Sequence, residues 1–224
     1  MTKASIVQQA GEQRADVDAV ARRAVKRPES IAELIAAFKA EKGTAKYGYE
    51  KVLRLVSERR PDLIYPHFDF FAALLDGNNN FLKWGAIRTV ANLTAVDRAG
   101  RFEALFEKYY APILGPTMIT AANIIGSSPR IVQAKPRLAA SIAQEILKVR
   151  RARYELHGVP SPECRNVAIG HAIKALDQIF DRIEDQAAMI QFVRRQLANT
   201  RRPVVRKAEQ FLRRHDKECG HVAI

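Results

Sequence analysis

Adjacent arginine and lysine side chains recur along this chain, and their chemistry is the recognition of phosphate or carboxylate groups. Guanidinium and ammonium groups form charge-assisted hydrogen bonds with such anions. The adjacent pairs are Arg22-Arg23, Lys26-Arg27, Arg59-Arg60, Arg150-Arg151, Arg194-Arg195, Arg201-Arg202, Arg206-Lys207 and Arg213-Arg214. From Lys148 to Lys217, 16 Lys and Arg stand against 8 Asp and Glu, an excess of +8 within a net charge of +13. The candidate partner-binding residues therefore lie in this last third: Arg150, Arg151, Arg194, Arg195, Arg201, Arg202, Arg206 and Lys207.

A net charge of +13 favours association with an acidic macromolecule, either a protein or a nucleic acid. The sequence does not decide between these two partners. A further interpretation stays open, in which the basic side chains are only solvated, because net charge alone specifies no particular ligand. If the pairs occupy equivalent places in successive structural repeats, they form a positive stripe whose binding weakens as salt rises.

Aromatic and histidine residues offer a second kind of chemistry. Trp84 is the only tryptophan, and an exposed indole could stack on a nucleic-acid base. Its helical spacing with Ile87 and Ala91 favours a place in the core instead. His67 and Asp69 could face a groove, although a satisfied structural pair is the favoured interpretation.

Metal and catalytic patterns are weak. His215, Cys219 and His221 are close in sequence, but a structural zinc ion takes four ligands and no fourth is adjacent, so we expect a disordered tail there. Cys164 and His171 fall on one side of a helix, which is not enough to define a nucleophile and its base. No glycine-rich phosphate loop, serine elbow or zinc-protease motif is present. We expect no catalytic residue, no metal site and no small-molecule cofactor.

The cellular setting follows from cysteine use and hydropathy. Two cysteines do not make a disulfide framework, which favours a reducing compartment. The N-terminus turns polar before a secretory signal could form. The stretch from Ile113 to Gly126 is interrupted by Gly115-Pro116 and is too short to cross a bilayer. We expect a cytoplasmic protein without membrane insertion.

Apolar residues at helical spacing predict a series of helices that position these side chains. Proline, glycine and asparagine mark the breaks between them. The expected helices are 15–25, 28–38, 47–60, 61–75, 80–94, 101–110, 139–154, 162–183, 186–199 and 201–215, with a further one opening at Gly115-Pro116. The strongest break is 156–162, and no alternating run predicts a strand.

A helical phrase with a small residue ahead of bulkier apolar ones recurs along the chain. Its alanines are Ala86, Ala121, Ala168 and Ala208, at steps of 35, 47 and 40 residues. Such a period is typical of stacked helical hairpins, none of which can bury its apolar face alone. The residues that we expect to be buried between layers are Ala86, Ile87, Val90, Leu93, Ile124, Ile169, Ile173 and Leu176.

Together with Pro61-Asp62 and Asn78-Asn79-Asn80, this pattern resembles the HEAT-repeat family, which grades into armadillo-like proteins. The resemblance extends from Ala45 to His215, with uneven steps. It implies an all-α, right-handed α-α superhelix of about five helical hairpins. We expect residues 1–28 to form an N-terminal cap or partly mobile arm, 29–215 the repeat domain and 216–224 a C-terminal tail.

The family implies two functional hypotheses. HEAT proteins are mostly interaction scaffolds, so the first is a non-catalytic scaffold that binds an acidic partner on a basic surface. The second is a HEAT-like DNA glycosylase, which needs an acidic residue beside exposed aromatic side chains and a basic DNA-binding face. An exposed Trp84 beside a groove-facing carboxylate would favour the enzyme, and a buried Trp84 would favour the scaffold.

Overall fold

The computed structural model describes residues 5–215, and within them the chain is almost entirely helical. The α-helices are α1 (Ile6–Gly11), α2 (Val17–Val25), α3 (Glu29–Ala40), α4 (Ala45–Arg59), α5 (Pro61–Ile64), α6 (Phe68–Leu74), α7 (Asn80–Leu93), α8 (Arg101–Tyr110), α9 (Met118–Ala134), α10 (Ala139–Leu147), α11 (Pro162–Ile179), α12 (Ala187–Arg194) and α13 (Arg202–His215). Short 3-10 turns extend or join them: η1 (Tyr65–His67), η2 (Thr94–Val96), η3 (Ala111–Leu114), η4 (Pro136–Leu138), η5 (Lys148–Arg151), η6 (Phe180–Arg182) and η7 (Arg195–Ala198). The predicted all-α class is confirmed, and no helix within 5–215 is long and apolar enough to cross a membrane.

Capping side chains explain where several helices begin. The Asn79 side chain accepts a hydrogen bond of 3.2 Å from the backbone N–H of Leu82 at the start of α7. Ser161 accepts one of 3.2 Å from Cys164, and Pro162 occupies the first turn of α11. Both caps satisfy backbone donors that a helix leaves unpaired at its N-terminus. The asparagine break and the proline start predicted from the sequence lie at these two sites.

The expectation of no strand is wrong at one place. β1 (Glu155–Leu156) pairs antiparallel with β2 (Val159–Pro160). His157 at φ 53° and Gly158 at φ 78° form the two-residue turn, and positive φ at both positions matches the right-handed twist of a hairpin. The helix expected over 139–154 accordingly ends as α10 at Leu147 and continues only as η5.

The contacts divide the chain into two compact units, Met1–Leu105 and Phe106–Ile224, with the division inside α8. In the first unit α4 is central and packs against α1, α2, α3, α5 and α7. Helices α1 and α2, which belong to the segment expected as a cap or arm, bury Ile6, Ala10, Val20, Ala21 and Ala24. A Cβ at Gly48 would lie 1.9 Å from the carbonyl oxygen of Ala10, so only glycine lets α1 approach α4 this closely.

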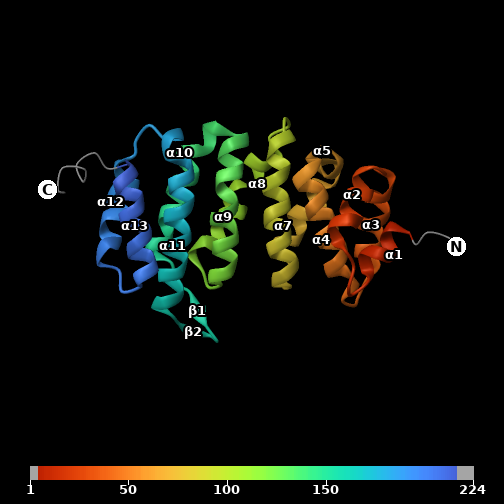
Figure 1. Cartoon of the computed structure of the whole chain (residues 1–224), viewed down its shortest axis with the longest axis horizontal. Helices are drawn as coiled ribbons and strands as arrows, with labels where there is room; N and C mark the ends of the chain where they lie inside the picture. The colour runs from red at the N-terminus through yellow and green to blue at the C-terminus, as the bar shows by residue number, and fades with distance from the viewer. Residues whose placement is uncertain (1–4, 216–224) are drawn as a thin grey trace. The chain divides into compact units, whose positions relative to one another are not determined.

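In the second unit α11 lies between α9 and α13, as Figure 1 shows. Helices α10 and α12 contact each other, and they also pack on α11 and α13 respectively. The buried residues of α11 are Ala168, Ile169, Gly170, Ala172, Ile173, Ala175, Leu176 and Ile179. The eight residues expected between layers, four in each unit, all have relative exposures of 5% or less. The predicted burial of these eight residues is confirmed.

Candidate functional site

The structure places the predicted partner-binding residues at the ends of helices in the second unit. Arg150 and Arg151 are in η5, Arg194 ends α12 and Arg195 begins η7, whereas Arg201, Arg202, Arg206 and Lys207 lie at or near the start of α13. All are exposed except Arg201 and Lys207, which are half-buried. Turn η7 packs on α12 and α13, whereas η5 packs on α10, α11 and η3. The later residues therefore share one region, and the pair in η5 has other neighbours.

Arg201 and Lys207 have partners within the unit. Arg201 forms an ion pair with Glu163 of α11. The Lys207 ammonium donates a 3.0 Å hydrogen bond to the carbonyl oxygen of Gly170. Burial lowers the pKa of Lys207, and the neighbouring cations Lys174 and Arg201 lower it further. Lys207 therefore sits where positive charge is concentrated.

Basic residues of α11 that the pair pattern missed lie beside Lys207. His171 and Lys174 are exposed, and the pKa of His171 is lowered first by burial and then by Lys207 and Lys174. Lys174 forms no hydrogen bond or ion pair within residues 5–215. Positions 171, 174 and 178 mark the exposed stripe of α11, and Arg182 follows in η6. This spacing could have been found in the sequence as polar positions opposite the apolar ones.

A groove between α9 and α11 continues this surface. Its cavity volume is about 450 Å³, and its lining residues are Gly126, Pro129, Arg130, Val132, Gln133, Gln178, Ile179 and Arg182. Arg130 and Arg182 are exposed, and within the described part of the chain neither makes a hydrogen bond or ion pair. Two free guanidinium groups and two glutamine amides at one groove supply the donors that a phosphate or carboxylate group requires.

An adjacent cavity on the same unit has a different character. Its volume is about 430 Å³, and Arg137 and Arg182 share its lining with Glu184 and Asp185. Carboxylates beside the arginines reduce the attraction for an anion. We define the cationic face as Arg130, His171, Lys174, Arg182 and Lys207, on α9, α11, η6 and α13.

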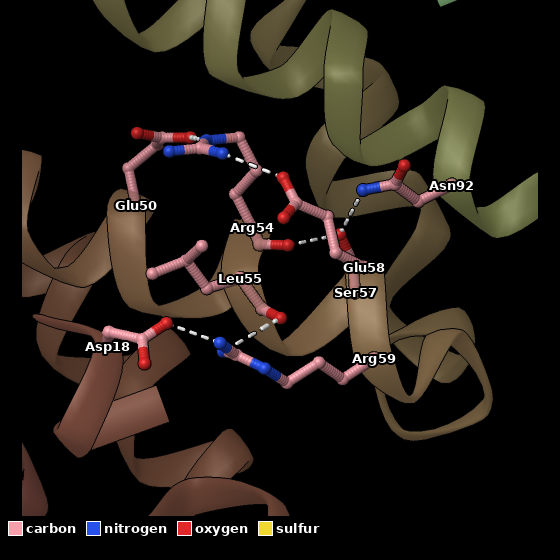
Figure 2. Close-up of polar contacts among 8 residues, drawn as sticks. All are labelled: Asp18, Glu50, Arg54, Leu55, Ser57, Glu58, Arg59 and Asn92. Carbon is pink, nitrogen blue, oxygen red and sulfur yellow. Dashed lines mark hydrogen bonds and ion pairs between the residues drawn. The ribbon is translucent and has the colours of Figure 1, made fainter. Parts of the chain in front are cut away.

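Other basic pairs stabilise the fold instead of forming a stripe. In the first unit Arg59 pairs with Asp18 of α2 and also donates to the carbonyl oxygen of Leu55 at 3.5 Å, as Figure 2 shows. Arg60 contacts both carboxylate oxygens of Asp62, at 2.9 and 2.7 Å. In the second unit Arg214 pairs with Asp177 at 2.7 Å. These contacts join a helix to a neighbour or close a turn.

A buried carboxyl lies where α4 crosses α7. Arg54 lies one turn after Glu50 on the same face of α4 (Figure 2). Its Nε is 3.6 Å from Glu50 Oε1, and its Nη1 is 2.8 Å from Glu58 Oε1. Within residues 5–215 Glu50 Oε1 accepts no hydrogen bond, and a Cβ at Gly85 of α7 would lie 1.9 Å from it. Burial raises the pKa of Glu50 to about 7, against the attraction of Arg54 and Arg88.

The aromatic residues near this crossing correct the expectation for Trp84. Trp84 is half-buried and not part of the core. Its ring packs edge-on against Phe81 at 5.3 Å between centroids, and Phe81 packs against Tyr47 at 6.1 Å. Phe81 is 68% exposed. Trp84 lies in the N-terminal half of α7 and is partly exposed, although Ile87 and Ala91 on the same face of the helix are buried. Helical spacing alone does not show where along a helix burial ends.

The remaining candidates have structural partners. Asp69 is exposed and pairs with Arg101, so the expected pairing with His67 is corrected. His215 Nε2 lies 2.8 Å from Asp177, and its ring stacks on Phe180 at 4.0 Å between centroids. Cys219 and His221 lie outside the described residues. Within 5–215, no three His, Cys, Asp or Glu side chains are grouped closely enough to hold a metal ion.

No family model, curated protein or solved structure matches this chain. Its functional assignment therefore depends on the geometry of its own residues.

Proposed function

We propose that the chain is a non-catalytic, HEAT-like helical-repeat module that binds an acidic macromolecule on the cationic face of its second unit. The observation that carries this proposal is the groove between α9 and α11, where Arg130 and Arg182 face solvent without partners among residues 5–215. An unpaired, exposed guanidinium is ready to bind an anion, because it has no ion pair to break first.

The surrounding charge strengthens the attraction of the groove. Lys174 and Lys207 both lie near enough to His171 to lower its pKa, and Lys174 also lowers the pKa of Lys207. Clustered cations produce a positive potential that speeds the encounter with a polyanion and raises its local concentration. A bound anion would also relieve the repulsion within this cluster and raise the pKa of His171.

The packing of the second unit supports the repeat architecture. Helix α11 contacts α9 and α13 on its two sides, while α10 and α12 form a second layer. This is the order expected when helical hairpins stack, each burying the apolar face of the next. Equivalent exposed positions of α9, α11 and α13 would then follow one another along a single surface, and a polymer could bind across them.

The glycosylase alternative has an exposed aromatic side chain at Phe81 and a partly exposed one at Trp84, but the carboxyl beside them does not suit the reaction. Glycosidic bond cleavage through an oxocarbenium-like transition state calls for an ionised carboxylate beside the substrate. Glu50 contacts Gly85, the residue after Trp84, but it is only 8% exposed and its pKa is about 7. A covered and partly protonated carboxyl is poorly suited to that role, so the scaffold hypothesis is the one we propose.

Nucleic acid and poly-glutamate are the probes that test this proposal. We expect DNA, RNA or the acidic polypeptide to bind at low salt, measured by fluorescence anisotropy, and Arg130→Glu/Arg182→Glu to weaken binding at least tenfold. The matched control is Lys26→Glu/Arg27→Glu, which makes the same change of net charge at exposed residues of the first unit. Equal binding by both variants, or no retention of any of the three probes, would overturn the proposal.

A further inference from the structure

We propose that Tyr47, Phe81 and Trp84 form a stacking platform for unpaired nucleic-acid bases. The platform lies on α4 and α7 of the first unit, so it goes beyond the proposed function, which concerns the cationic face of the second unit. It uses a different chemistry, the π faces of aromatic rings, and its test does not require the cationic face.

The exposure of Phe81 is the first observation. Its side chain is 68% exposed, more than that of any other large hydrophobic residue in 5–215. It stands between two further rings, with Tyr47 at 6.1 Å and 76° and Trp84 at 5.3 Å and 67°. A cluster of solvent-exposed aromatic rings is typical of a binding site. The exposure of these apolar rings to water is unfavourable, and a ligand that covers them removes that cost.

The platform is also held in place before any ligand arrives. The Asn79 side chain accepts from the Leu82 N–H at 3.2 Å, and its amide donates to the Tyr47 hydroxyl at 2.8 Å. One residue therefore caps α7 and ties the Tyr47 ring of α4 to it. A rigid aromatic surface loses little conformational entropy on binding, which favours affinity.

The surrounding charge indicates which ligand fits. Lys46 places its ammonium 5.8 Å from the Tyr47 ring centroid, and Lys83 lies between Phe81 and Trp84 in the sequence. Lys51 follows Tyr47 by one turn of α4 and is exposed, whereas Glu50 of the same helix is buried. Exposed rings among lysines match a ligand with both planar bases and phosphates, and such bases are accessible in a single strand but not in a duplex.

The lone tryptophan makes this proposal directly measurable. Trp84 is the only tryptophan, so its intrinsic fluorescence reports on the platform alone. We expect an oligothymidylate of about ten nucleotides, which matches the site size of common single-strand binders, to quench this fluorescence. An abasic oligonucleotide of the same length, a duplex and an aliphatic peptide should quench it far less. Phe81→Ala should weaken oligothymidylate binding about tenfold or more, in line with the loss of one stacked base.

Two variants separate this site from the cationic face. Leu197→Ala removes an apolar side chain that is 44% exposed in the second unit, and it should leave the quenching unchanged. Quenching by oligothymidylate should persist in Arg130→Glu/Arg182→Glu, because these residues belong to the cationic face. The stacking platform can therefore be tested even if the cationic face binds no anion. Equal quenching by the abasic strand, stronger quenching by the peptide, or full binding by a folded Phe81→Ala would overturn the platform.

Discussion

Glu50 shows how one side chain can tie the stability of this protein to pH. Its carboxyl is buried between α4 and α7, and its Oε1 accepts no hydrogen bond from the described part of the chain. Desolvation disfavours the charged form, which raises its pKa from 4.5 to about 7. The folded protein therefore holds this proton at a pH where the unfolded chain has released it. A raised carboxyl pKa contributes stability that is fully present below about pH 4.5 and is lost as pH rises through 7.

We accordingly expect the free energy of unfolding to fall by up to about 3 kcal/mol between pH 4.5 and pH 8, since one pKa unit corresponds to about 1.4 kcal/mol. Glu50→Gln keeps the shape of the side chain without the titration, so it should remove this fall. Urea denaturation across the pH range measures the effect. The control is Glu58→Gln, an exposed carboxyl that also contacts Arg54. An unchanged pH slope in Glu50→Gln would show that Glu50 is ionised when folded.

At the scale of the elements, α11 determines the organisation of the second unit. It packs against α9, α10 and α13, and its buried positions occupy most of its circumference. After its exposed first turn, the exposed positions of α11 are His171, Lys174 and Gln178. A helix with neighbours on several sides has apolar residues on each of them, so only a narrow stripe is left for solvent.

Ile173 is the residue on which this packing can be tested. It is 1% exposed at the middle of α11, so Ile173→Ala leaves a cavity and should cost about 2–4 kcal/mol of unfolding free energy. Ala168→Arg, at a position with no exposure, should prevent soluble expression. Gln178→Ala is the control on the exposed stripe of the same helix. A urea midpoint that is the same for Ile173→Ala and Gln178→Ala would mean that α11 is not packed as described.

At the scale of the whole molecule, the net charge of +13 is distributed between structural and unpaired cations. Arg59, Arg60 and Arg214 are engaged in ion pairs with carboxylates. Arg202 and Arg206 are exposed on α13 and form no ion pair within 5–215. The proposed binding of a polyanion would therefore depend on a subset of the basic residues and not on the total.

This distinction predicts how charge reversal on α13 separates binding from folding. Arg202→Glu/Arg206→Glu should leave helicity and melting behaviour intact. If these side chains bind phosphates, the slope of log K against log salt should become shallower by about 0.9 for each phosphate of duplex DNA that is no longer neutralised. Arg201→Glu/Lys207→Glu should instead lower the melting temperature, because it breaks the interactions with Glu163 and Gly170. Circular dichroism and binding titrations across a salt series measure both. An equal fall in the melting temperature of the two variants would contradict the assignment of Arg201 and Lys207 as structural residues and of Arg202 and Arg206 as unpaired ones.

The sequence by itself determined the all-α class, the helix starts at Asn79 and Ser161, and the burial of Ile87, Ile124 and Ile173. These features are local, because helical periodicity and capping depend on residues three or four positions apart. It also indicated a basic C-terminal third, since charge is a matter of composition.

Only the tertiary structure decided which side chains meet. Arg130 and Arg182 are 52 positions apart by their numbers, and they line one groove because α9 packs beside α11. Glu50 is buried because Gly85 of another helix has no side chain there. The crossing and axial register of two helices depend on many side chains at once, and a pattern along one helix does not encode them. For the same reason the pairs Arg59-Arg60 and Arg201-Arg202 looked alike in sequence, yet only Arg202 is left without a partner in the described chain.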